Sequence, residues 1–222
     1  MRETSTQRAG RAAQIFERLA SAYPEAATEL DFGTPLELLV AVLLSAQCTD
    51  VRVNQVTPAL FARFRSAEDF ARAKPQEIEP YIKTCGLYRN KAQAIALASR
   101  AIVAEHGGQV PTSREALVQL PGIGNKSAGV ISMHLSETEH AFPVDTHVAR
   151  LSFRLGLSRA DRPDDIERDL RELLPRGLWK PGHHQLILHG RRVCTARAPK
   201  CPQCPLLDLC PRNGLPKLAK EE

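Results

Sequence analysis

The stretch from Leu120 to Ala128 reads Leu-Pro-Gly-Ile-Gly-Asn-Lys-Ser-Ala and joins two segments with helical patterns. Pro121 ends the first helix, because proline lacks the N–H that continues a helix. Gly122 and Gly124 permit positive φ and a close approach by another backbone. The second helix starts at once, so its free N–H groups point out of the turn and can bind a phosphate. The stretch therefore predicts two helices joined by a phosphate-binding glycine hairpin, with a tight turn that binds nothing as the alternative.

Helical patterns continue on both sides of the hairpin. Thr34 and Pro35 form an N-cap followed by proline at the first helical position, a typical helix start. Thr49 can cap the next helix, which Pro58 is expected to end or kink. Asn90 to His106 carries an apolar stripe along one face. Because no segment shows sustained alternation of the strand type, the sequence predicts an all-α fold.

Composition limits the class of protein. The chain has 222 residues, enough to bury a sizeable core without disulfides, and its 43% hydrophobic and 25% charged residues are typical of a globular protein. The longest strictly apolar run, Leu38 to Leu44, is far too short to span a membrane. The polar N-terminus has no apolar segment of the secretory type. We therefore expect a protein of the cytoplasm with no membrane partner.

Lys126 and Asp145 are the candidate catalytic residues. Lys126 lies in the first turn of the helix after the hairpin, where a positive side chain opposes the helix dipole, and such local conflicts often mark functional positions. A lysine amine that gives up its proton can act as a nucleophile, whereas contact with phosphate or solvent is the alternative. Asp145 stands where the next helix begins, so it is predicted to cap that helix. Near Lys126, its carboxylate could also accept a proton or stabilise a developing cation.

Four of the six cysteines lie close together near the C-terminus, with the spacing C-x6-C-x2-C-x5-C: Cys194, Cys201, Cys204 and Cys210. Without an export signal, clustered cysteines more often bind a metal than form disulfides. Four thiolates fit a tetrahedral zinc ion or a cubane iron–sulfur cluster, and the spacing leaves both open. Residues 189–200 carry four basic residues and no acid, which suggests a polyanionic partner or a solvated face.

Together, three motifs closely resemble the endonuclease III family, the bifunctional DNA glycosylases and abasic-site lyases of base-excision repair. These motifs are Leu120 to Ala128, Val144 to His147, and the spacing of the four cysteines. The likeness extends upstream to Leu43 to Asp50, which resembles the family segment LLSAQ-x-TD, and to Gly86 to Ala92, which resembles GLY-x-x-KA. The resemblance spans about residues 28–213.

This resemblance implies an all-α chain with two helical domains. Residues 28–138 would form a six-helix bundle that carries the helix-hairpin-helix, at about 112–135. Residues 1–27 and 139–222 would form a second domain from both chain ends. That domain would hold a [4Fe-4S] cluster on the four clustered cysteines. The implied partner is double-stranded DNA with damaged pyrimidines or abasic sites, bound by a monomer that is nucleoid-associated if the source is bacterial.

The resemblance also implies the chemistry. Lys126 would attack C1′ of a nucleotide flipped out of the duplex, displace an oxidised pyrimidine and form a Schiff base, with assistance from Asp145. β-Elimination would then cut the strand 3′ to the abasic site. Gln47 and Leu87 match the positions that fill the vacated space. Contacts to the DNA backbone would come from Gly122, Gly124, Arg197 and Lys200.

The sequence departs from the commonest family pattern in small ways. Asn125 stands where a basic residue is frequent, and Gly129 where Asn is frequent. These two differences affect how tightly the DNA strand is bound and which damaged bases are preferred. Cys48 is less usual in its segment and could respond to oxidation if exposed. The alternatives are a monofunctional mismatch glycosylase that uses an activated water, and a non-catalytic helix-hairpin-helix module that binds DNA. Lys126 and Asp145 favour the bifunctional enzyme.

Overall fold

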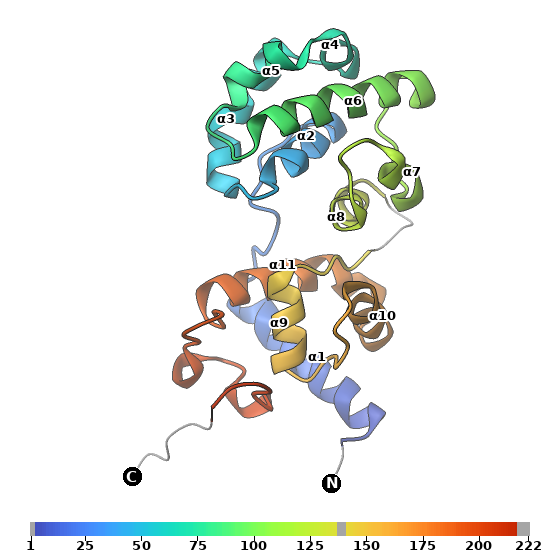
Figure 1. Cartoon of the computed structure of the whole chain (residues 1–222). Coiled ribbons are helices and arrows are strands. Elements are labelled where there is room, and N and C mark those ends of the chain that lie inside the picture. The colour runs from blue at the N-terminus through green and yellow to red at the C-terminus, as the bar shows by residue number, and fades with distance from the viewer. Residues whose placement is uncertain (1–2, 137–140, 217–222) are drawn as a thin grey trace. The chain divides into compact units, whose positions relative to one another are not determined.

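The computed structural model describes residues 3–136 and 141–216, and every regular element in those ranges is helical. The all-α class is therefore confirmed (Figure 1). The chain divides into two compact units. We call Thr28–Glu139 the bundle unit, and Met1–Ala27 with His140–Glu222 the terminal unit. In the described ranges, no helix has the length and apolar character needed to cross a membrane.

The bundle unit is built around one buried helix, α2 (Pro35–Ser45). All side chains from Leu38 to Leu44 are buried, as expected for a helix that is apolar on every face. Helices α3, α6 and α8 each contact α2, so the glycine hairpin before α8 is built against the central helix (Figure 1). The other helices of this unit are α3 (Asp50–Arg63), α4 (Ala67–Arg72), α5 (Pro75–Ile82), α6 (Tyr88–His106), α7 (Arg114–Gln119) and α8 (Asn125–Leu135).

Helix starts in this unit follow the local sequence. Four N-cap hydroxyls each accept a hydrogen bond from the backbone N–H three residues further on: those of Thr34, Thr49, Ser66 and Ser113. Between residues 28 and 136 the unit has seven α-helices, and α4 and α5 among them are short. The division between α4 and α5 falls at Lys74, whose backbone is extended because a proline follows it.

Pro58 does not end its helix, as one of the two expected outcomes had it, because α3 continues through Pro58 to Arg63. A proline inside a helix costs about 3 kcal/mol. Val53 and Leu60, on either side of it, are fully buried in the core of the bundle unit. Burial of such side chains stabilises the fold by about 1.5–3 kcal/mol each, which is enough to offset the proline.

Both ends of the chain share one core in the terminal unit. Ile15 and Phe16 of α1 (Ser5–Ala22) are buried with Leu151 of α9 (Thr146–Arg154) and Leu186 of α11 (Trp179–Arg192). Helices α1 and α11 meet at Gly182, where an added Cβ would lie 2.7 Å from Cε1 of Phe16. The remaining elements of this unit are α10 (Pro163–Leu173) and three short 3-10 helices, η1 (Arg176–Leu178), η2 (Cys201–Gln203) and η3 (Leu207–Leu209).

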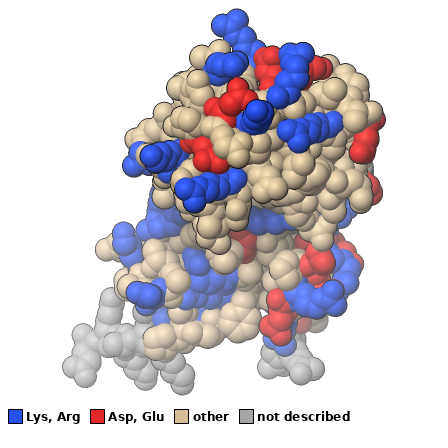
Figure 2. Space-filling view, turned by 45° about the horizontal axis from the view of Figure 1, so that its top comes forward, with Lys and Arg blue, Asp and Glu red and all other residues tan. Residues whose placement is uncertain are grey.

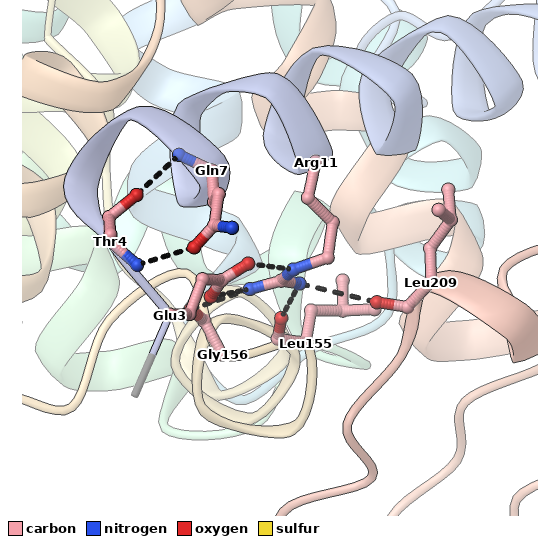
Figure 3. A network of polar contacts seen from close by, with 7 residues as sticks. All are labelled: Glu3, Thr4, Gln7, Arg11, Leu155, Gly156 and Leu209. Atoms are coloured by element: carbon pink, nitrogen blue, oxygen red, sulfur yellow. Dashed lines mark hydrogen bonds and ion pairs between the residues drawn. The ribbon is translucent and has the colours of Figure 1, made fainter. Parts of the chain in front are cut away.

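Arg11 connects α1 to the chain around the cysteine segment (Figure 3). Its Nη1 donates to the carbonyl oxygens of Leu155 at 2.5 Å and Leu209 at 3.3 Å, and its Nη2 donates to that of Gly156 at 3.3 Å. Glu3 pairs with the same guanidinium at 2.7 Å. The N-terminal helix therefore holds η3, which directly precedes the last clustered cysteine.

Candidate functional site

The glycine hairpin lies between α7 and α8. Gly122 has a φ of +83°, and an added Cβ would lie only 2.7 Å from the Cβ of Ala94. Gly122 is therefore required for the backbone conformation and for close packing on α6. Gly124 differs from the prediction, because its φ is −89° and an added Cβ would meet nothing within 4 Å. The fold does not require a glycine at 124, and the space beside it is open.

The start of α8 faces that open space. Gly124 is its N-cap residue, no side chain caps the first turn, and no acid lies there. The first N–H groups of α8 thus lack an N-cap partner, which is the arrangement that binds an anion at a helix N-terminus. Lys126 lies in this first turn, as the sequence predicted, and the structure leaves it exposed. Its amine is accessible to a substrate held at the hairpin.

Asp145 caps α9, which confirms its predicted capping role. Its Oδ1 accepts a hydrogen bond from the N–H of Val148 at 2.8 Å. Residues 141–144 before it are buried, and the carbonyl of Pro143 is bound by Nδ1 of His183 at 2.9 Å. The carboxylate is therefore held on a rigid backbone and is only partly exposed. Lys126 belongs to the bundle unit and Asp145 to the terminal unit, so their approach stays a prediction.

Arg150 and Arg154 connect α9 to the cysteine segment, and sequence reasoning missed both. Arg150 donates through Nε to the carbonyl of Cys194 at 3.1 Å and contacts Nδ1 of His147 at 3.1 Å. Arg154 is 8% exposed and donates to the carbonyl of Thr195 at 2.7 Å and to Sγ of Cys194 at 3.4 Å. Their spacing of four residues, which places both on one helix face, was the available signal.

The four clustered cysteines line one small, mainly apolar pocket together with residues of α9 and α11. None of the four forms a disulfide. Polar groups also converge on the sulfur atoms: the N–H of Leu206 donates to Sγ of Cys204, and Nε2 of His189 lies 3.4 Å from the same sulfur. Within the described part of the chain, no three His, Cys, Asp or Glu side chains form a site for a single metal ion. The residues present nevertheless fit a multi-thiolate cluster, which is held by four cysteines with hydrogen bonds to its sulfurs.

Burial shifts the pKa values of the cysteine and histidine side chains that line this pocket. It raises the pKa of the Cys204 thiol to about 11 and also raises the pKa of Cys210. It lowers the pKa of His189 to about 4, so the ring is neutral at pH 7. The buried thiols stay protonated without metal, and a coordinated metal offsets this because it deprotonates a bound thiol outright.

Arg197 and Lys200 lie in the loop between the first two clustered cysteines, and both are exposed. The loop is closed by a hydrogen bond from the N–H of Lys200 to the carbonyl of Val193 at 3.0 Å and by one from the Thr195 hydroxyl to the carbonyl of Ala198 at 2.7 Å. The two cations are therefore presented to solvent on a short, ordered loop.

Gln47 and Leu87 have left-handed backbones, with φ values of 53° and 58°. This conformation costs a non-glycine residue about 1–3 kcal/mol and is concentrated at functional sites. Both residues are exposed, and Leu87 is 57% exposed despite being apolar. Their loops are adjacent, because a Cβ on Gly86 would lie 3.4 Å from the carbonyl oxygen of Gln47. Buried Lys91 is bonded near both loops: its Nζ donates to the carbonyl of Leu44 at 2.8 Å, and its backbone N–H donates to the carbonyl of Leu87 at 3.1 Å.

Surface charge alone does not mark the site. Figure 2 shows Lys and Arg side chains on the visible face of both units, with Asp and Glu side chains among them. Local geometry is more informative within each unit: the bundle unit has an open helix start and two strained, exposed residues, and the terminal unit has a basic loop beside a cysteine pocket.

Two family models match the chain. The model for the HhH-GPD superfamily base excision DNA repair protein covers residues 40–176, and the model for the iron-sulfur binding domain of endonuclease III covers residues 194–210. Endonuclease III of Synechocystis sp. is 49% identical over 201 residues, which are 90% of this chain and 92% of that protein. Endonuclease III of Bacillus subtilis is 44% identical over 199 residues, 89% of this chain and 90% of that protein.

Solved structures of endonuclease III also resemble this chain. A trapped covalent intermediate of endonuclease III with DNA superposes with a TM-score of 0.86 at 40% identity, covering 92% of this chain and 96% of that one. A non-covalent endonuclease III–DNA complex gives the same TM-score and identity over 92% of this chain and 95% of that one. A thermostable thymine-DNA glycosylase, at 22% identity and a TM-score of 0.82 over 91% of this chain and 96% of that one, shares the fold.

Fold and site thus define an all-helical, DNA-binding repair enzyme with a helix-hairpin-helix and a [4Fe-4S] cluster. Within this class, the chain belongs to the endonuclease III family of the HhH-GPD superfamily. The resemblance seen in the sequence is confirmed, and so are the cofactor and the expectation of a DNA glycosylase and abasic-site lyase.

Proposed function

We propose that this chain removes oxidised pyrimidines from duplex DNA and then cleaves the strand 3′ to the abasic site, using the amine of Lys126 as the nucleophile. The observation that carries the proposal is the exposed Lys126 in the uncapped first turn of α8. A side chain there lies beside any phosphate bound by the helix start, so it can reach the sugar attached to that phosphate.

Gln47 and Leu87 would fill the space left when the damaged nucleotide leaves the stack. An enzyme that acts on C1′ must extrude the nucleotide and offset the lost stacking. An exposed leucine on a strained backbone, 57% exposed, is suited to enter a base stack. The close approach of the two loops at Gly86 supports insertion of both residues at one site.

Grip on the DNA backbone would come from both units. Gly122 holds the hairpin turn, and Gly124 leaves the N–H groups of α8 open to a phosphate. In the terminal unit, Arg197 and Lys200 would contact further phosphates. When bound by the four clustered cysteines, the [4Fe-4S] cluster supplies the fixed shape of this basic loop.

The residues of the chain then supply the chemistry. The amine nitrogen of Lys126 forms a bond to C1′, while the bond from C1′ to the base breaks and its electron pair leaves with the base. Asp145, held rigidly as the cap of α9, would take a proton from the amine or stabilise the developing cation. Opening of the sugar ring gives an iminium that acidifies C2′. Loss of a C2′ proton then expels the 3′ phosphate, which is the β-elimination step.

Borohydride trapping tests this proposal, because it reduces an iminium to a stable amine and leaves protein joined to DNA. The full, cluster-loaded chain should form this adduct with duplexes that contain oxidised pyrimidines or abasic sites. Lys126→Ala should form none, whereas Lys83→Ala, which removes an exposed lysine at the end of α5, should form it as the wild type does.

The outcome also separates the alternatives. A monofunctional mismatch glycosylase would release a base without adduct or strand cleavage, and a non-catalytic module would bind DNA and do neither. Adduct formation by Lys126→Ala would overturn the role of this lysine.

We further propose that the chain acts as a monomer on chromosomal DNA, in the nucleoid if the source is bacterial. Sedimentation of the complex with a single-lesion duplex tests this, because a monomer gives a mass of one protein chain per duplex.

A further inference from the structure

Cys48 and Cys85 lie outside the set of clustered cysteines, and both belong to the bundle unit. Cys48 directly follows Gln47, and Cys85 is two residues before Leu87. Their backbones approach each other, because an added Cβ on Gly86, next to Cys85, would lie 3.4 Å from the carbonyl oxygen of Gln47, next to Cys48. Cys48 is also a side-chain hydrogen-bond partner of Cys85, although the chain separates the two by the whole of α3, α4 and α5. Both are free thiols. The contact therefore joins the bases of the two loops that carry Gln47 and Leu87.

The two thiols differ in their surroundings. Cys85 is 1% exposed, and burial together with the hydrogen bond to Cys48 raises its pKa to about 11. Cys48 is only partly buried, at the end of the turn after α2. Lys91 and Arg52 are close enough to act electrostatically on Cys85 in the opposite direction. A small oxidant can therefore reach Cys48 first, while Cys85 stays protected and in contact.

We propose that Cys48 and Cys85 are a peroxide-oxidisable thiol pair whose disulfide joins the Gln47 loop to the Leu87 loop. The sulfur of Cys48 attacks one oxygen of the peroxide, the O–O bond breaks, and Cys48 becomes a sulfenic acid while one water leaves. The sulfur of Cys85 then attacks the Cys48 sulfur, displaces the hydroxyl and yields the disulfide and a second water. In total, two thiols lose two electrons and two protons, and one hydrogen peroxide is reduced to two waters.

The consequence for activity rests on the proposed function, in which Gln47 and Leu87 enter the vacated stack. A disulfide one residue from Gln47 and two residues from Leu87 prevents the two loops from adjusting independently to the DNA. A displacement of about 1 Å in a positioning group can lower turnover about a hundredfold. We therefore expect the oxidised enzyme to bind duplex DNA through the hairpin and basic loop but to lose turnover on lesions by about that factor.

The test treats the full, cluster-loaded chain with hydrogen peroxide at doses that leave the visible absorption of the cluster unchanged. Remaining thiols are blocked, the protein is digested, and mass spectrometry is used to find a peptide that joins Cys48 to Cys85. Turnover on lesion-bearing duplex is measured before oxidation, after it and after reduction with dithiothreitol. Cys48→Ser and Cys85→Val serve as matched variants, since neither can form the disulfide and neither residue contacts DNA in the proposal.

A joined peptide in the wild type, with a loss of turnover that dithiothreitol reverses and that both variants escape, supports the proposal. Sulfinic acid at Cys48 without a joined peptide would overturn the pairing. A joined peptide with unchanged turnover would overturn its effect on the loops. Failure of the proposed function is distinguishable, because then the reduced wild type would show no lesion turnover, whereas the peptide measurement would still decide whether the pair forms.

Discussion

Substitution of Gly122 by alanine should destabilise the bundle unit strongly, whereas the same change at Gly124 should not. At Gly122 the backbone has a φ of +83°, which costs a residue with a β-carbon about 1–2 kcal/mol. The added Cβ would also lie 2.7 Å from the Cβ of Ala94 and 3.4 Å from Cδ2 of Leu43. A β-carbon cannot rotate away, so overpacking adds about 1–3 kcal/mol. The expected loss in the free energy of unfolding is therefore about 2–5 kcal/mol.

Thermal unfolding followed by circular dichroism measures this difference. In a chain of this length each kcal/mol lowers Tm by about 2–4 °C, so Gly122→Ala should melt roughly 4–20 °C below the wild type. Gly124 has a φ of −89° and open space around it, so Gly124→Ala should cost about 1 kcal/mol or less, as for an N-cap exchange. If Gly122→Ala melts like the wild type, or if Gly124→Ala melts at a lower temperature than Gly122→Ala, the packing argument is wrong.

Although Gly124→Ala should keep its stability, it should bind duplex DNA several-fold more weakly than the wild type. The added methyl group occupies the space through which a phosphate approaches α8. Asp145→Asn should keep both the cap of α9 and DNA binding, since Asn caps a helix as well as Asp does, but should lose most turnover in single-turnover assays; full turnover would exclude a role for this carboxylate. Arg154→Lys should lower the iron content of the purified protein, because lysine cannot reproduce the fork that binds Cys194 and Thr195, and each buried carbonyl left unpaired costs about 1–3 kcal/mol. Arg168→Lys, at an exposed surface ion pair, is its control and should retain its iron. Arg197→Ala and Lys200→Ala should each reduce the slope of log K against log salt by about 0.9, and an unchanged slope would contradict their contact with phosphate.

Local sequence was sufficient for much of the fold. Thr34, Thr49 and Asp145 were predicted to begin helices and do so, because an N-cap side chain satisfies backbone N–H groups within three residues of itself. The place of Lys126 in the first turn after the hairpin followed from the sequence in the same way. Pro58 shows the limit of such reasoning, since α3 continues through it once Val53 and Leu60 pack into the core.

The site itself depended on both levels. The sequence determined which chemical groups exist: an amine after a glycine turn, a carboxylate at a helix start and four thiols at close spacing. These follow from residue type and from interactions within a few residues. Only the tertiary structure distinguished Gly122 from Gly124, brought the strained Gln47 and Leu87 loops together and placed Arg154 on the cysteine pocket. Those features depend on contacts between distant segments, whose energies no local pattern of residues encodes.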